Sequence, residues 1–136
     1  MITGSCLCKA VRYKAEAAPL ITRACWCRVC QYFAAGNAAI SAAFMRNAVT
    51  IEGETKDYVS VADSGSVMHR RFCPTCGVPM FSEAERRPHV IFIRVGTFDD
   101  PELVRPTATI WAASAPSWAT IDATIPRIDG QPPPIA

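Results

Sequence analysis

Three short clusters hold all seven cysteines of this 136-residue chain, and they constrain its fold more than any other feature. The clusters are Cys6-Leu7-Cys8, Cys25-Trp26-Cys27-Arg28-Val29-Cys30 and Cys73-Pro74-Thr75-Cys76. Buried cysteines that act only as small apolar side chains would be scattered along the chain. The first residues do not resemble a secretory signal, so we expect a cytoplasmic protein with reduced thiols that bind metal instead of forming disulfides.

The third cluster is typical of a zinc knuckle, a tight turn that directs two sulfurs at one ion. In Cys73-Pro74-Thr75-Cys76-Gly77, proline presets the φ of the turn and glycine follows where a positive φ is often needed. A redox-active Cys-x-x-Cys would instead open a helix within a βαβ unit. The flanking residues Phe72 and Met80-Phe81 favour strands, so the spacing predicts a metal-binding turn.

Cys6 and Cys8 can supply the further ligands that a structural zinc ion needs. Such an ion prefers four ligands in a tetrahedron, and Cys73 and Cys76 provide only two. Both sulfurs of Cys6-Leu7-Cys8 can reach one metal ion only if the chain kinks there, and Gly4-Ser5 allows such a loop. The resulting four-cysteine site would close a loop of about 65 residues.

The second cluster then retains Cys25, Cys27 and Cys30, three ligands within six residues. Three protein ligands and an open fourth position are typical of a catalytic zinc ion. The alternative is a structural site that His69 or His89 completes. Spacing alone leaves both interpretations open, together with other groupings of the three clusters. We therefore expect two zinc ions per chain, one structural and one potentially catalytic.

The charge of the chain excludes some classes of partner. The formal charge is +2, and seven thiolates with two zinc ions would take it to about −1. Apart from Arg70-Arg71 and Arg86-Arg87 there is no basic run, so we expect no nucleic-acid partner.

The longest nearly apolar run, residues 90–95, is far shorter than a membrane span of ~20 residues. Arg23 and Arg28, near the second cluster, are candidate partners for a substrate carboxylate.

Short strands separated by turn residues predict an all-β fold. Segments with β-type residues are 10–15, 48–52, 58–61, 67–72, 80–82, 90–95 and 107–112. We expect a further strand at residues 39–45 and one helical turn within 28–35. Residues 1–125 are expected to form a single domain, and the proline-rich residues 126–136 a tail that is extended along the surface or disordered.

Together, these motifs resemble the glutathione-dependent formaldehyde-activating enzyme (GFA) family, which includes the centromere-protein-V-like domains. The resembling segments are Gly4-Ser5-Cys6-Leu7-Cys8, Val11-Arg12-Tyr13, Cys25-x-Cys27-x-x-Cys30, Arg71-Phe72-Cys73-Pro74-Thr75-Cys76-Gly77, Val95-Gly96-Thr97-Phe98-Asp99-Asp100-Pro101 and Ser117-Trp118. The resemblance implies a GFA-like β-tent fold, in which several small antiparallel sheets of short strands surround the zinc-cysteine sites. It also implies a structural zinc on Cys6, Cys8, Cys73 and Cys76, and a second zinc on Cys25, Cys27 and Cys30.

The function implied by the resemblance is that of a carbon–sulfur lyase. In the founding activity, formaldehyde and glutathione combine to give S-hydroxymethylglutathione, or the adduct is split in reverse. The expected partner is therefore a small-molecule thiol or thiol–aldehyde adduct. The alternative is a non-catalytic zinc module for structure or interaction, which Trp26 would support by blocking the open position. A thiol-redox or metal-buffering protein is a third interpretation.

Three positions depart from the family pattern and leave the cysteines intact. Trp26 stands where a histidine is common between the first two cysteines of the second cluster. Lys9 replaces a common glycine after Cys8, and Thr109 stands where many members have histidine. These departures bear on the substrate and on proton transfer, and they do not alter the expected metal ligands.

Overall fold

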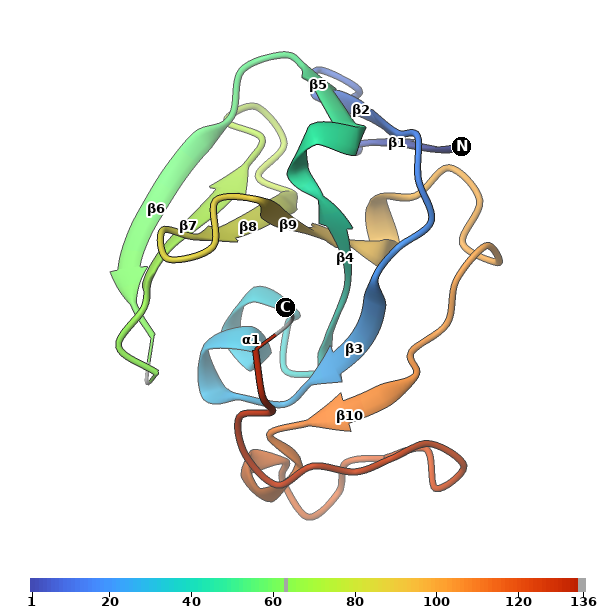
Figure 1. The fold of residues 1–136 in the computed structure, drawn as a ribbon. Helices are drawn as coiled ribbons and strands as arrows, with labels where there is room; N and C mark the ends of the chain where they lie inside the picture. Colours follow the sequence, from blue (N-terminus) through green and yellow to red (C-terminus); the bar gives the residue numbers. More distant parts are fainter. Residues whose placement is uncertain (63, 135–136) are drawn as a thin grey trace.

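The protein is described by a computed structural model that covers residues 1–62 and 64–134, and the predicted all-β class is confirmed (Figure 1). The strands of the described residues are β1 (Ile2–Ser5), β2 (Arg12–Ala15), β3 (Ile21–Cys25), β4 (Ala39–Met45), β5 (Val49–Glu52), β6 (Lys56–Val61), β7 (Val67–Phe72), β8 (Pro79–Ala84), β9 (Val90–Arg94) and β10 (Ala108–Ile110). The helices are α1 (Arg28–Phe33) and the short 3-10 helices η1 (Arg46–Ala48), η2 (Val95–Thr97) and η3 (Ala112–Ser114).

These strands form two sheets. Strands β1, β2 and β5 make a small antiparallel sheet, and the other seven lie in the order β10-β3-β4-β9-β8-β7-β6. Neighbours in the large sheet are antiparallel, except that β10 pairs parallel with β3. In Figure 1 the large sheet bends around α1, and the small sheet lies on the face of the large sheet that points away from α1. The large sheet therefore has one face toward the small sheet and one face toward α1.

The hydrophobic core lies between the two sheets. Its large members include Tyr13 from the small sheet and Phe44, Phe81, Ile91 and Ile93 from the large one. The Tyr13 ring packs edge-on against Phe81, with 5.6 Å between centroids. Successive strand residues point to opposite faces, so the core side chains alternate with residues that face α1. The large sheet thus separates a packed interior from a second, more polar surface.

The chain departs from the predicted elements mainly at its amino-terminal end. Strands β1 and β3 were not expected, because Ile2–Ser5 and Ile21–Cys25 contain few strong strand formers. Strand β3 forms because β4 and β10 pair with its two edges, an interaction between distant segments. The predicted helical turn is α1, which ends before Ala35 and Gly36, both with positive φ. Within the described residues, no helix is long and apolar enough to span a membrane.

The tail runs in an extended conformation beside β10. The Thr109 N–H donates to the carbonyl of Pro126 (2.9 Å), and the Ile128 N–H donates to the carbonyl of Thr109 (2.8 Å). Beyond the strand, the Trp111 indole Nε1 donates to Gln131 Oε1 (3.0 Å). Of the two states predicted for the tail, these contacts correspond to the extended one. Residues 135–136 lie outside the described residues, and the division at residue 125 stays a prediction.

Candidate metal centres

Cys6, Cys8, Cys73 and Cys76 bring four sulfurs together, all within 4.8 Å of one another. The Sγ of Cys8 lies 3.6 Å from that of Cys6 and 3.7 Å from that of Cys73. Four thiolates at ~2.3 Å from one tetrahedral zinc ion would lie ~3.8 Å apart. This closed cluster therefore fits a zinc ion in both donor type and spacing. Cys6 and Cys73 belong to the hydrophobic core, so the ion would lie at the edge of the packed interior.

Backbone N–H groups point at the sulfurs of the closed cluster. The Cys73 Sγ accepts hydrogen bonds from the backbone N–H groups of Thr75 (3.4 Å) and Cys76 (3.5 Å). Hydrogen bonds from the backbone of Cys8 and Val78 lower the pKa of the Cys76 thiol to about 6. Such donors stabilise thiolates, which are the forms that bind zinc. The knuckle predicted from Cys73-x-x-Cys76 is thus present as a turn built for thiolate ligands.

Lys9 adopts a left-handed backbone conformation, which glycine enters more readily than other residues. Its φ is +65°, in the left-handed region, and its N–H donates to the carbonyl of Cys6 (3.1 Å). This turn returns the chain so that Cys8 approaches Cys6. A residue with a Cβ atom pays ~1–2 kcal/mol in this region, whereas glycine enters it freely.

Lys9→Gly is expected to raise the free energy of unfolding by about 1 kcal/mol, because the strain at the left-handed residue is removed. Denaturant unfolding of the zinc-loaded protein measures the change. Lys9→Ala is the matched control, since it removes the charge and keeps the Cβ atom, and it should bring no gain. Equal stabilisation by both substitutions would show that charge, and not backbone strain, is responsible.

Cys25, Cys27 and Cys30 form a second cluster, with their sulfurs within 4.8 Å of one another. Cys25 ends β3, and Cys27 caps α1, where its Sγ accepts a hydrogen bond from the backbone N–H of Cys30 (3.3 Å). Hydrogen bonds with the other two thiols, together with burial, raise the pKa of Cys25. Hydrogen bonds with Cys25 and then Cys30 lower the pKa of Cys27, which favours its thiolate. A divalent cation among the three sulfurs would allow all of them to ionise.

The described residues place no fourth Cys, His, Asp or Glu side chain with these three sulfurs. His69, one of the two candidates for completing the site, binds Asp57 and Glu85 instead. His89 is exposed. Trp26 is 2 % exposed, and it is not among the described residues that line the space in front of the cluster. This second cluster, here called the open cluster, is therefore neither completed by histidine nor covered by Trp26.

A cleft of about 360 Å³ opens in front of the open cluster. Its floor is the face of the large sheet that points away from the core, so lining residues lie two positions apart on each strand. Arg23 and Cys25 line it from β3, and Phe92 and Arg94 line it from β9. The register of the sheet pairs Arg23 and Arg94 with the same residue, Ser41 on β4. The sheet thus carries basic and hydroxyl side chains beside the three sulfurs.

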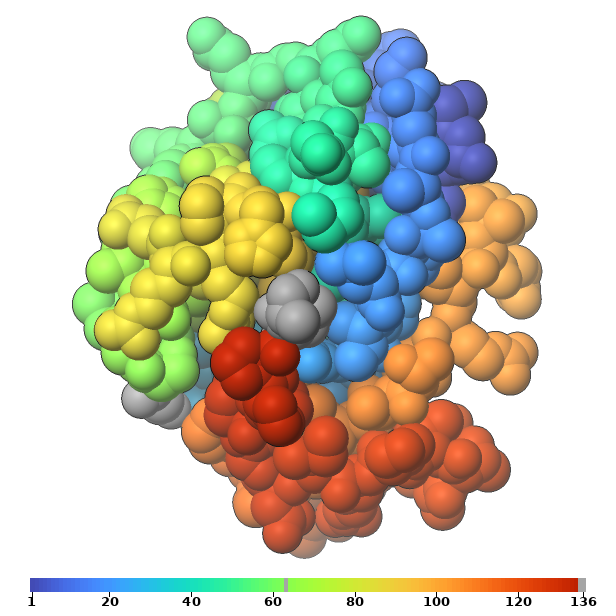
Figure 2. All heavy atoms as spheres, viewed as in Figure 1, coloured from blue at the N-terminus to red at the C-terminus, as the bar shows by residue number. Residues whose placement is uncertain are grey.

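The tail forms one side of this cleft. Gln131, Pro132 and Pro134 are among its lining residues, together with Trp111, whose indole is hydrogen-bonded to Gln131. In Figure 2 the carboxyl-terminal segment, in red, lies across the face of the molecule that is toward the viewer. The tail predicted to run along the surface therefore also borders a candidate functional site.

Of the two arginines that the sequence analysis named as candidate substrate partners, only one lies at the cleft. Arg23 lines the cleft, whereas Arg28 is exposed, donates to Gln31 Oε1 (2.6 Å) and lies over the Tyr32 ring. The other arginines of the cleft were missed as site residues, although the basic pairs of the sequence include three of them. Arg70 and Arg94 face the cleft because of the register in which their strands pair, and local sequence does not show this register. Arg86 and Arg87 reach the cleft from the connection between β8 and β9. Thr109 is buried.

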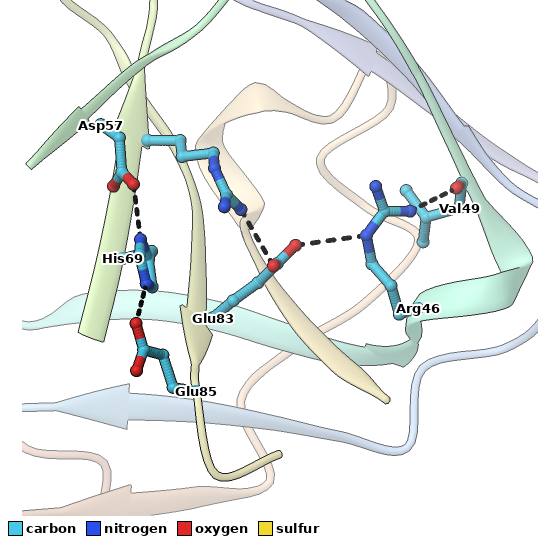
Figure 3. Close-up of polar contacts among 7 residues, drawn as sticks. Arg46, Val49, Asp57, His69, Glu83 and Glu85 are labelled. Atoms are coloured by element: carbon cyan, nitrogen blue, oxygen red, sulfur yellow. Dashed lines mark hydrogen bonds and ion pairs between the residues drawn. The ribbon is translucent and has the colours of Figure 1, made fainter. Parts of the chain in front are cut away.

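His69 lies outside the cleft, in a cluster with two carboxylates (Figure 3). Its Nδ1 contacts Asp57, and its Nε2 lies 2.7 Å from Glu85 Oε2. Its neighbours on β7, Met68 and Arg70, line the cleft, so the imidazole faces the opposite side of the sheet. Hydrogen bonds to Asp57 and then to Glu85 raise the pKa of His69. This histidine is therefore a structural group and does not serve as a base in the cleft.

We expect His69 to make stability depend on pH. Because its pKa is raised on folding, its contribution is complete below the unfolded pKa of ~6.5 and is lost as pH rises through the folded value. His69→Gln should therefore cost more stability at about pH 6 than at about pH 9 in urea unfolding. Asp57→Asn keeps the imidazole and should shrink the pH dependence. A pH-independent loss in His69→Gln would contradict the assignment.

An all-β fold with one closed and one open cysteine cluster defines a small protein that could hold two metal ions, one of them facing a cleft. The family model described as glutathione-dependent formaldehyde-activating enzyme matches residues 1–114, and the chain belongs to this GFA family. The predicted family is confirmed. Residues 115–136, including the tail beside the cleft, lie beyond the matched segment.

Comparison with solved structures supports the fold. A crystal structure of a Rhodobacter sphaeroides protein, determined in a structural genomics programme, matches with a TM-score of 0.58 and 23% identity. The match covers 76% of this chain and 91% of that chain. At this identity the likeness concerns the fold alone. No curated protein matches the chain.

Proposed function

We propose that the protein is a zinc-dependent carbon–sulfur lyase that acts on a thiol–aldehyde adduct of the S-hydroxymethylglutathione type. The observation that carries this proposal is the open cluster, where three sulfurs without a fourth described ligand face a cleft of about 360 Å³. Membership of the GFA family supports the reaction class. Cys25, Cys27 and Cys30 would hold the catalytic ion, and Cys6, Cys8, Cys73 and Cys76 the structural one. A cytoplasmic location would keep these thiols reduced.

The reaction breaks one bond and moves one proton. In the cleavage direction the adduct RS–CH₂–OH loses its hydroxyl proton, the carbon leaves as formaldehyde, and the sulfur keeps the electron pair of the C–S bond. The reverse reaction joins the same parts. A zinc ion bound at the open cluster would supply a position that stabilises the substrate sulfur as a thiolate. Three cysteine thiolates and one divalent ion carry a net charge of −1, which favours holding the thiolate over strong polarisation of the aldehyde.

Ser41 is the group of this chain that we assign to the oxygen of the adduct. It lies on the cleft floor, buried, and its Oγ accepts a hydrogen bond from Arg94 Nη1 (2.7 Å). Because that bond uses a lone pair of Oγ, the hydroxyl proton is free to be donated into the cleft. In the described residues no histidine lines the cleft, so the proton of the adduct would pass to solvent and not to an imidazole.

Nuclear magnetic resonance tests the proposal directly. The zinc-loaded protein is mixed with ¹³C-formaldehyde and several thiols, and exchange between free aldehyde and adduct is measured. We expect faster exchange than in protein-free samples for at least one thiol. No acceleration with any thiol would refute the lyase.

Cobalt substitution distinguishes a lyase from the alternative, a non-catalytic zinc module. An open position at Cys25, Cys27 and Cys30 should change its visible spectrum when a small thiol is added. A filled or blocked position would leave the spectrum unchanged. Because Trp26 is buried and does not line the described part of the cleft, we expect the change.

A further inference from the structure

The side chains that line the cleft include a group of positively charged residues. Five arginines line it, and they come from β3, β7, the β8–β9 connection and β9: Arg23, Arg70, Arg86, Arg87 and Arg94. The part of the lining that the structure describes contains no aspartate or glutamate. The open cluster with a bound divalent ion would offset only one of these charges. The described part of the cleft lining is therefore strongly positive, although the whole chain is close to neutral.

These arginines are not neutralised by ion pairs within the described chain. The arginine ion pairs found there join Arg46 and Arg71 to Glu83, on side chains that do not line the cleft. Among the described residues, the side-chain hydrogen-bond acceptors of the cleft arginines are hydroxyls: Arg70 donates to Ser60 Oγ, and Arg94 donates to Ser41 Oγ. Arg70 also lies over the Phe33 ring, which carries no net charge. A hydroxyl orients a guanidinium and leaves its charge intact. Among the described residues, no carboxylate therefore neutralises the positive charge of the cleft.

Burial and mutual repulsion make the charged forms of these neighbouring arginines less stable. The pKa of Arg70 is lowered chiefly by burial, and Arg94 adds to this effect. Half-buried cations that lie together without carboxylate partners among the described residues are typical of an anion-binding site. Guanidinium groups also match the planar, two-oxygen geometry of acid groups.

We infer that the cleft selects a thiol that carries at least two acid groups and no ammonium group. This inference rests on the proposed function, which makes a thiol the substrate. Glutathione carries two carboxylates and one ammonium, and that ammonium would meet arginines and no carboxylate in the described lining. A thiol whose acid groups are not balanced by an ammonium would place its sulfur at the open cluster and its acid groups against Arg23, Arg70 and Arg94.

Binding of two thiols with the same skeleton tests the inference. Glutathione and N-acetylglutathione differ in the ammonium group, and 2-mercaptoethanol lacks acid groups altogether. Each is titrated into cobalt-substituted protein without aldehyde, with the visible spectrum and calorimetry as readouts. We expect N-acetylglutathione to bind ~10-fold more tightly than glutathione and ~100-fold more tightly than 2-mercaptoethanol. The preference should shrink at ~0.5 M salt, where charges are screened.

Substitutions of the cleft-lining arginines test whether these side chains, and not the rest of the cleft, recognise the acid groups. Arg70→Gln and Arg94→Gln should each weaken N-acetylglutathione ~10-fold and leave 2-mercaptoethanol within ~2-fold. Arg28→Gln, outside the cleft lining, is the matched control and should change neither thiol. Glutathione that binds as tightly as its N-acetyl derivative would overturn the inference, as would variants that weaken all thiols equally.

The outcomes also separate this inference from the proposed lyase. Selective binding of N-acetylglutathione without any acceleration of aldehyde exchange refutes the lyase and supports the charge selection. Accelerated exchange together with a preference for glutathione refutes the charge selection and supports the lyase. Absence of thiol binding refutes both.

Discussion

Cys76→Ala is expected to lower the free energy of unfolding of the zinc-loaded protein by at least about 4 kcal/mol and its melting temperature by ~15 °C. The closed cluster joins the loop after β1 to the turn after β7, and two of its sulfurs lie in the core. Three remaining ligands would hold the ion weakly, and the buried thiols of Cys6 and Cys73 would lose their common partner. Differential scanning calorimetry with parallel metal analysis measures both effects.

A second substitution keeps this prediction specific to metal binding. Cys76→His retains a zinc ligand and should recover part of the lost stability. Thr75→Ala alters the same turn without removing a ligand and should shift the melting temperature by only a few degrees. If Cys76→Ala melted within a few degrees of the unsubstituted protein, the closed cluster would not be a structural metal site.

Cys27→Ala is expected to reduce kcat/KM of the proposed lyase by at least ~10³-fold while the fold is retained. Zinc content should fall from two ions to one per chain, because two sulfurs in the open cluster hold an ion poorly. Stability should fall by only ~1 kcal/mol, since the lost hydrogen bond from the Cys30 N–H is a single helix cap. Aldehyde exchange, metal analysis and calorimetry on one preparation give the three quantities.

Comparison of the two cysteine variants tests the division of labour between the clusters. Tyr32→Ala is the control for α1, because that side chain is exposed and lies one turn from the cap. It should keep both ions and most of the activity. Equal losses of melting temperature in Cys27→Ala and Cys76→Ala would contradict a structural role for one cluster and a catalytic role for the other.

The cysteine chemistry was readable from the sequence, because ligands of one metal site are close along the chain or fall in short, recognisable turns. Cys73-x-x-Cys76 predicts its own turn, and Cys25, Cys27 and Cys30 can meet on one turn without knowledge of the rest of the fold. The strand-rich character was equally visible in short runs of β-type residues, such as 67–72 and 90–95. These features depend on local spacing and composition.

The group of arginines that lines the cleft could not be predicted from the sequence in the same way. Arg23 and Arg94 meet across Ser41, and Arg70 lies opposite Ser82, only because distant strands pair in one particular register. A shift of one residue would turn these side chains toward the core face. Strand β3 has the same origin, since pairing with β4 and β10 decides its conformation. Pairings between distant segments decide which side chains share a cleft. No short stretch of the sequence contains both strands of such a pair.

The path of the tail has a practical consequence for work with this protein. Since Pro134 borders the cleft, an affinity tag fused shortly after it would begin beside the cleft and would compete with a molecule that binds there. Met1 is 80% exposed and precedes β1 in the small sheet, on the other side of the large sheet. Purification handles belong at that end, and kinetic constants measured with carboxyl-terminal fusions should be compared with those of cleaved material.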